Sequence, residues 1–221
     1  MHIFITGHKD RNEALQQLLA PKYQVTLSDQ VPSGLMPHIE LLIDTSFDED
    51  PDTRLKVYLK TGVKNLWLHT LRCTITPLLH RIPVPDQIHI AGINALPLFI
   101  NSPLWEMYYA SNSDEKIAEK ILSPIGKKML CIPEQMGMLS PRIIFMIINE
   151  AYYVVQEGVT TRADTDMAMK LGTNYPYGPF EWAEKLGIKN VYHTLLSLLK
   201  DSGDPRYKIC ALLRREAETA F

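Results

Sequence analysis

The sequence predicts an α/β domain built on a parallel sheet, followed by an all-helical domain. In the first half, short apolar segments alternate with stretches of helical periodicity, which is the pattern of a parallel sheet covered by helices. After about residue 110, amphipathic helical segments follow one another with little strand-like sequence between them. We therefore expect two domains, over residues 1–110 and 111–221.

The first domain contains five apolar segments that are typical of strands, at residues 2–6, 24–27, 41–44, 65–69 and 87–91. Between the first two segments, the leucines of residues 11–19 recur at helical spacing. Asp50 and Pro51 have the pattern of an N-cap followed by proline at the first helical position. This pair predicts a helix that runs to about Lys60.

The second domain is expected to begin with a helix at Ser113, because Asp114 and Glu115 follow that residue. A short segment at residues 128–132 is a candidate for one last strand. Glycine and capping residues then delimit four further helices, at residues 140–157, 161–172, 178–187 and 191–199. In this pattern Gly172 closes the second of the four.

Charge and composition argue against several classes of function. The chain has 23 basic and 25 acidic side chains, and its net charge of −2 gives no general attraction to nucleic acid or to an anionic membrane. No apolar run is long enough to span a membrane, and the N-terminal segment lacks the basic stretch of a signal peptide, so we expect a cytoplasmic protein. Cys73, Cys131 and Cys210 lie far apart, which predicts reduced thiols, and no histidine or cysteine cluster predicts a metal site.

The turn after the first strand is a candidate cofactor site. A strand that runs into a glycine turn and then a helix is where an α/β sheet binds a dinucleotide. The turn keeps only the first glycine of the G-x-G-x-x-G pattern, at Gly7, because Lys9 and Asn12 hold the other two glycine positions. Asp29 ends the second strand, where an acidic side chain would take the ribose hydroxyls. Gly7 and Asp29 are therefore candidate residues for binding NAD or NADP.

Two other interpretations of this turn remain open. In one, Gly7 serves only a tight turn and Asp29 is an exposed strand-end residue. In the other, Lys9 and Arg11 at the start of the helix hold a different phosphate by direct charge pairing.

The most specific motif lies in the second domain. Residues 164–172 read DTDMAMKLG, and residues 175–181 read YPYGPFE. Together they closely resemble the motif D-x-D-x-A-M-K-L-G-x-x-Y-P-x-G-P-F-E in the C-terminal domain of 3-hydroxyacyl-CoA dehydrogenases. The resemblance extends over residues 137–215, and it implies a shortened Rossmann-like NAD(P)-binding domain ahead of a helical domain of the 6-phosphogluconate dehydrogenase-like type.

The resemblance also implies a set of catalytic positions. The family transfers hydride between NAD and the 3-hydroxyl carbon of an acyl-CoA, in fatty-acid metabolism. A histidine acts as the general base, a glutamate orients it, and a serine and an asparagine help to hold the substrate. The histidine position falls on Asn94, and the glutamate position on Glu106, twelve residues later. The serine position falls on Leu71 or Arg72, and the asparagine position on Pro141.

Glu106 is thus the candidate catalytic residue that the resemblance retains. Its alternative role is a strand-end carboxylate bonded to nearby backbone. Asparagine cannot take up a proton at neutral pH, so the family's general base is missing at Asn94. The remaining candidate for a base is His69, acting from a displaced position that faces Glu106.

Three functions remain open. The chain is a weakly active or inactive family member that binds ligands or partners, an active oxidoreductase on another hydroxy acid with an unrecognised base, or a scaffold without a small ligand. Acyl-CoA or a related small molecule is the expected ligand. The family forms homodimers through its helical domain, and the longest expected helix carries Tyr152 and Val154 outside its main apolar stripe. We therefore expect a homodimer formed through the helical domain.

Overall fold

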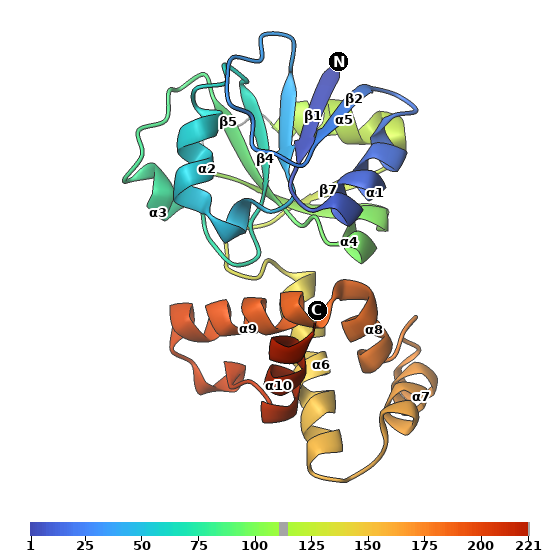
Figure 1. Cartoon of the computed structure of the whole chain (residues 1–221). Helices are drawn as coiled ribbons and strands as arrows, with labels where there is room; N and C mark the ends of the chain where they lie inside the picture. The colour runs from blue at the N-terminus through green and yellow to red at the C-terminus, as the bar shows by residue number, and fades with distance from the viewer. Residues whose placement is uncertain (111–114, 221) are drawn as a thin grey trace. The chain divides into compact units, whose positions relative to one another are not determined.

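Seven strands form a single sheet in the computed structural model of the chain, which describes residues 1–110 and 115–220 (Figure 1). In chain order they are β1 (His2–Thr6), β2 (Gln24–Ser28), β3 (Leu41–Asp44), β4 (Asn65–His69), β5 (His89–Ile93), β6 (Leu104–Tyr109) and β7 (Lys128–Cys131). Their order across the sheet is β2-β1-β3-β4-β5-β6-β7, and all neighbours are parallel except β5 and β6. The structure therefore confirms the predicted α/β fold with a parallel sheet.

Helices connect these strands and cover the sheet, which explains why its central strands are apolar on both faces. The helices are α1 (Lys9–Leu19), α2 (Pro51–Tyr58), α3 (Thr76–Leu79), α4 (Pro97–Asn101) and α5 (Glu115–Leu122), with 3-10 turns η1 (Phe47–Glu49) and η2 (Ser123–Ile125). Apolar residues of α1, α4 and α5 join one core with β1, β3, β4 and β5. Asp50 caps α2 as predicted, because its side chain accepts a hydrogen bond from the Thr53 N–H and Pro51 starts the helix.

The chain divides into two compact units, Met1–Met138 and Leu139–Phe221, later than the predicted boundary near residue 110. The reason is that α5 and β7 belong to the sheet unit, since β7 pairs with β6 over its whole length. β6 itself was not predicted, although its sequence LWEMYY is rich in the aromatic residues that favour strands. The predicted helix start at Ser113 and Asp114 lies outside the described residues.

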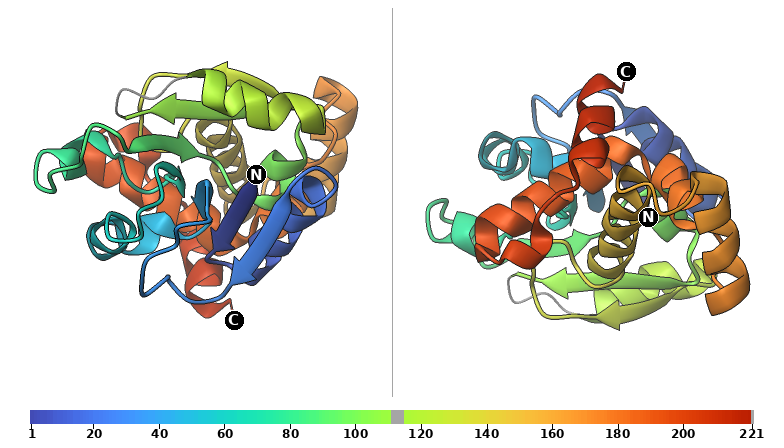
Figure 2. Two further views of the ribbon diagram at one scale, coloured as in Figure 1. Left: turned by 90° about the horizontal axis from the view of Figure 1, so that it is seen from above. Right: turned by 90° about the horizontal axis from the view of Figure 1, so that it is seen from below.

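The second unit is all-helical, as predicted. Its elements are α6 (Ser140–Gln156), α7 (Arg162–Thr173), α8 (Pro179–Leu186), α9 (Ile188–Ser202), η3 (Pro205–Tyr207) and α10 (Ala211–Thr219). α6 contacts each of the other four α-helices and lies among them in the right-hand view, which is seen from below (Figure 2). The prediction that Gly172 closes α7 was wrong, because the helix continues to Thr173 and Asn174 adopts the left-handed conformation that ends it.

The motif that carries the family resemblance has a structural explanation. The carboxylate of Asp166 in α7 accepts hydrogen bonds from the backbone N–H groups of Phe180 and Glu181, at 2.8 and 3.2 Å, and so caps α8. At Gly178 a Cβ atom would lie only 2.3 Å from this carboxylate, so a larger residue would displace it. The aspartate and the glycine of the motif therefore lock α7 to the start of α8.

Candidate functional site

The candidate site lies where the parallel strands of the first unit end. Gly7 follows β1, Asp29 follows β2, Asp44 ends β3, His69 ends β4 and Asn94 follows β5. Because these strands are parallel, all five residues lie along one edge of the sheet. This carboxyl edge is where open α/β sheets bind their ligands.

The glycine turn at this edge is packed against the chain that follows β3. Gly7 has a φ of +115°, and a Cβ atom there would lie 2.5 Å from Thr45 Oγ1 and 2.8 Å from the Ser46 nitrogen. The His8 N–H donates to Thr45 Oγ1 at 2.9 Å, and the Thr45 hydroxyl lies 2.7 Å from Asn12 Oδ1 and donates to it. Side chains of this protein therefore occupy the space beside the turn.

Asp29 lies close to this turn in the sheet, as the sequence predicted. It follows Ser28, which is the register partner of Thr6, and Gly7 follows Thr6. The side chain of Asp29 is exposed, and the Thr6 hydroxyl donates to the Gln30 carbonyl oxygen at 3.1 Å across the same strand ends. The structure thus brings Gly7 and Asp29 to neighbouring strand ends, while their roles in cofactor binding stay predictions.

A buried ion-pair cluster fills the centre of the edge. The Asp48 carboxylate in η1 is inaccessible to solvent and accepts two hydrogen bonds from Arg72, from the guanidinium at 2.7 Å and the backbone N–H at 3.0 Å. Arg72 also pairs with Glu49 at 3.3 Å, and Glu49 in turn lies 2.8 Å from His8 Nε2. The cluster therefore extends from the end of β4 to the glycine turn.

The charges in this cluster balance one another. Burial by itself raises the pKa of Asp48, but His69 and Arg72 outweigh it and hold that pKa below its usual value. Burial lowers the pKa of Arg11 to about 10, and this guanidinium donates to the Thr45 carbonyl oxygen. Arg11 is 4% exposed, so it does not reach out towards a phosphate as the charge-pairing interpretation requires.

Asp44, at the end of β3, has its own partners. Both of its carboxylate oxygens accept from Arg54, at 3.1 and 3.0 Å, and one also accepts from the Tyr58 hydroxyl. Burial raises the pKa of Asp44, although Arg54 and Tyr58 oppose that effect. Together with the cluster around Asp48, the edge contains three guanidinium groups and three carboxylates. The guanidinium groups are those of Arg11, Arg54 and Arg72, and the carboxylates are those of Asp44, Asp48 and Glu49. These six groups therefore add no net positive charge to the edge.

The residues at the turn do not fit the pyrophosphate of a dinucleotide. A bound pyrophosphate needs close approach to glycine backbone and free N–H groups. Here the His8 N–H already donates to Thr45, and the Glu49 carboxylate lies beside the turn through its contact with His8. A pyrophosphate at this position would find the His8 N–H already bonded and would be repelled by the negative charge of Glu49.

Asn94 and Glu106 adjoin the last pair of the β5–β6 ladder. The antiparallel register of these strands pairs Ile93 with Met107; Asn94 follows Ile93, and Glu106 precedes Met107. The Asn94 Oδ1 atom accepts from the Leu96 N–H at 3.1 Å, whereas its Nδ2 atom is buried without a partner among the described residues. The amide can therefore donate a hydrogen bond into the site, but it cannot take up a proton.

His69 does not fit the role of a displaced base. Its Nδ1 atom accepts from the Ala95 N–H at 3.0 Å, and its Nε2 atom lies 3.7 Å from Asp48. Burial lowers the pKa of His69 to about 3, although Asp48 opposes this shift, so the ring is neutral at physiological pH. Both ring nitrogens face groups of the protein other than Glu106.

The positions that the resemblance assigns to the family's serine and asparagine hold side chains that cannot take over those roles. Leu71 is buried in the core, Arg72 belongs to the ion-pair cluster, and Pro141 starts α6 in the second unit. Two important residues of the edge, Thr45 and Asp48, were not predicted. The run of polar residues that directly follows the fully buried strand β3 could have indicated that they belong to the site.

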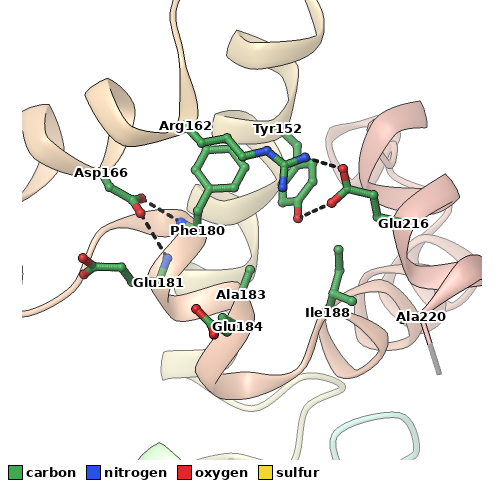
Figure 3. Close-up of a pocket in the computed structure, with 10 residues that line it drawn as sticks. All are labelled: Tyr152, Arg162, Asp166, Phe180, Glu181, Ala183, Glu184, Ile188, Glu216 and Ala220. Atoms are coloured by element: carbon green, nitrogen blue, oxygen red, sulfur yellow. Dashed lines mark hydrogen bonds and ion pairs between the residues drawn. The ribbon is translucent and has the colours of Figure 1, made fainter.

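The helical unit contains a pocket of about 530 Å³ (Figure 3). The Arg162 guanidinium lies over the rings of Tyr152 and Phe180, 5.4 and 5.1 Å from their centroids, and pairs with Glu216. The Tyr152 hydroxyl donates to the same carboxylate at 3.0 Å. These contacts tie α6, α7, α8 and α10 together, and they give the pocket a structural role that the sequence did not predict.

The described residues contain neither a candidate metal cluster nor a membrane-spanning helix. Over residues 1–110 and 115–220, no group of three or more His, Cys, Asp or Glu side chains could hold a metal ion. Within the same ranges, no helix combines the length and the hydropathy needed to cross a membrane.

Acidification should destabilise the protein through His69. Its pKa is about 3 in the folded state and about 6.5 in an unfolded chain. Between these values the unfolded state binds the extra proton, so the free energy of unfolding should fall as the pH drops, by up to about 1.4 kcal/mol per pH unit. Urea unfolding at pH values from about 7 to about 5 measures this slope.

The control is His69→Gln, which keeps an acceptor for the Ala95 N–H but does not titrate. This variant should show a shallower slope than the wild type over the same pH range. Equal slopes in the two proteins would mean that His69 is not the group responsible.

Comparisons with known proteins agree with this architecture. Residues 137–220 match the family described as "3-hydroxyacyl-CoA dehydrogenase, C-terminal domain". A 3-hydroxyadipyl-CoA dehydrogenase of Escherichia coli is 43% identical over 110 residues, which are 49% of this chain and 23% of that protein. A probable 3-hydroxybutyryl-CoA dehydrogenase of Bacillus subtilis is 36% identical over 105 residues, 48% of this chain and 35% of that protein. The chain thus spans about a quarter to a third of these curated relatives.

Solved structures support the same assignment. A 3-hydroxybutyryl-CoA dehydrogenase of Escherichia coli matches with a TM-score of 0.59 and 32% identity, over 70% of this chain and 32% of that one. An (S)-3-hydroxybutyryl-CoA dehydrogenase of Ralstonia eutropha shares the fold with a TM-score of 0.74 at 18% identity, over 98% of this chain and 93% of that one. The predicted resemblance is confirmed for the helical unit: residues 137–220 belong to the family of the 3-hydroxyacyl-CoA dehydrogenase C-terminal domain.

Proposed function

We propose that this chain is a family member that does not perform the family's hydride transfer and acts instead as a dimeric binding or scaffolding protein. The observation that carries this proposal is Asn94. It occupies the position that the resemblance assigns to the general base, and its side-chain amide oxygen already accepts a hydrogen bond from the Leu96 N–H. An amide in this position cannot remove the proton of a 3-hydroxyl group.

The glycine turn supports the same conclusion. The family is NAD-dependent, and hydride transfer needs the nicotinamide to be held at the edge of the sheet. In this chain Thr45 and Ser46 fill the space at Gly7, and Glu49 adds a negative charge beside the turn. Loss of the base and loss of the cofactor site are two separate barriers to the reaction.

Binding without turnover remains compatible with this edge. The Asn94 Nδ2 group is buried, has no partner among the described residues, and can donate a hydrogen bond to a carbonyl oxygen. The relatives are named for acyl-CoA substrates. An acyl-CoA or a related carbonyl compound is therefore the ligand class that we propose for the site.

A second candidate function is an oxidoreductase with an unrecognised base. The observation that favours it is Glu106, which persists at its family position, is only 8% exposed, and directly precedes Met107, the register partner of Ile93. On this account a carboxylate would have to take the proton that a histidine takes in the family.

We further propose that the protein forms a homodimer through the helical unit. In α7, Thr165 is the one buried residue of twelve, while Met167 and Leu171 lie one turn apart and are 56% and 81% exposed. Such a stripe is typical of a helix that is covered by a partner. Ile143 at the start of α6 is also 55% exposed. A second copy of this chain is the occupant that the family resemblance favours.

We also propose a cytoplasmic location. Cys73, Cys131 and Cys210 are all free thiols, which suits a reducing compartment.

The catalytic proposal predicts no NADH oxidation when the purified chain is mixed with acetoacetyl-CoA. Asn94→His restores an imidazole, but it should also stay inactive, because the turn at Gly7 does not fit the cofactor. Absorbance of NADH measures both rates. Turnover by the wild type that Glu106→Gln abolishes would support the second candidate instead. Activity in Asn94→His alone would show that the cofactor binds and that the base is the sole defect.

The dimer proposal predicts that light scattering after gel filtration gives twice the 25.2-kDa chain mass. Leu171→Glu should convert the protein to a monomer, because it places a charge in an apolar contact. The matched control is Leu35→Glu, which changes an equally exposed leucine of the first unit and should leave the dimer intact. A wild-type monomer at about 50 µM would contradict the proposal.

A further inference from the structure

A second polar feature lies at the opposite edge of the sheet, where the parallel strands begin. Asn65 is the first residue of β4, His89 is the first residue of β5, and the two are register partners in these adjacent strands. Neighbouring strands lie about 4.8 Å apart, so the two side chains stand next to each other on one face of the sheet. Helix α5 covers them there, through Ile117 and Ala118.

Both side chains carry a buried polar atom that lacks a protein partner. Asn65 Oδ1 and His89 Nδ1 have no hydrogen bond to any of the described residues. The orientation of the Asn65 amide is fixed, because its Nδ2 group donates to the Glu40 carbonyl oxygen at 2.8 Å. The Oδ1 atom that remains is therefore an acceptor, and it needs a donor.

Asn65 and His89 line the same small cavity. Its volume is about 10 Å³, and its walls are formed by Asn65, Trp67, His89, Ala91, Tyr109, Ile117 and Ala118. A cavity needs about this volume to hold one water molecule, and no organic ligand fits into it. A buried polar atom without a hydrogen bond loses its interaction with water and gains nothing in return, so a donor in this cavity is strongly favoured.

We propose that this cavity binds one water molecule, which donates one hydrogen bond to Asn65 Oδ1 and one to His89 Nδ1. The water joins the start of β4 to the start of β5 beneath α5. It also sets the histidine tautomer, because an Nδ1 atom that accepts a hydrogen bond leaves the ring proton on Nε2. This proposal is independent of the proposed function, because the cavity lies at the other edge of the sheet.

A crystal structure of the full chain tests the site directly. The expected result is one peak of solvent density within hydrogen-bonding distance of both Asn65 Oδ1 and His89 Nδ1. Absence of that density, or a direct contact between the two side chains, would overturn the proposal.

A double-mutant cycle gives a second test that needs no crystals. Asn65→Leu and His89→Leu each remove one of the two acceptors of the shared water. With a shared water, the urea midpoint of the double variant should fall by less than the sum of the two single losses. Additive losses would mean that the two side chains share no bridging molecule.

Discussion

The carboxyl edge of the sheet depends on the hydrogen bonds and the ion pair between the buried Asp48 carboxylate and Arg72. The carboxylate accepts both the backbone N–H and the guanidinium of Arg72, and so joins the turn after β3 to the end of β4. Through Arg72 and Glu49 the same network reaches His8 at the glycine turn after β1. Removing one partner from such a pair leaves a buried charge unpaired, at a cost of about 3–5 kcal/mol. Three strand ends are therefore held by one set of ion pairs.

This network changes what the edge can do. In a dinucleotide-binding domain the same edge is lined by glycine backbone and keeps its donors free. Here those donors and the adjoining space are used by side chains of the protein, from Thr45 in particular. The helical unit shows the opposite behaviour, because Asp166 and Gly178 retain the contacts that lock α7 to α8. The contacts of the family motif are thus kept in the helical unit, whereas loss of the family's chemistry at the sheet edge is what we propose.

The sequence predicted the elements whose signals are local. β1, β3 and β4 were recognisable because both faces of each strand are apolar, and the start of α2 because Asp50 and Pro51 cap it. β6 was missed although its aromatic sequence favours a strand, and the unit boundary was placed too early because the candidate strand at residues 128–132 joins the sheet only through tertiary pairing with β6. The family resemblance assigned Asn94 and Glu106 to catalytic positions, and these assignments stay predictions. The Asp48 cluster escaped prediction because its partners are 24 residues apart.

Thr45, Ser46 and Glu49 at the glycine turn should close the carboxyl edge to a dinucleotide. The most direct measurement is thermal unfolding of the purified chain with and without NADH and NADPH, followed by calorimetric titration. A ligand at a hundred times its dissociation constant would stabilise the folded state by about 2.7 kcal/mol, which is a shift of several degrees. The account predicts no shift with either cofactor. A saturable shift with one of them would contradict it and would mean that the turn at Gly7 opens to admit the pyrophosphate.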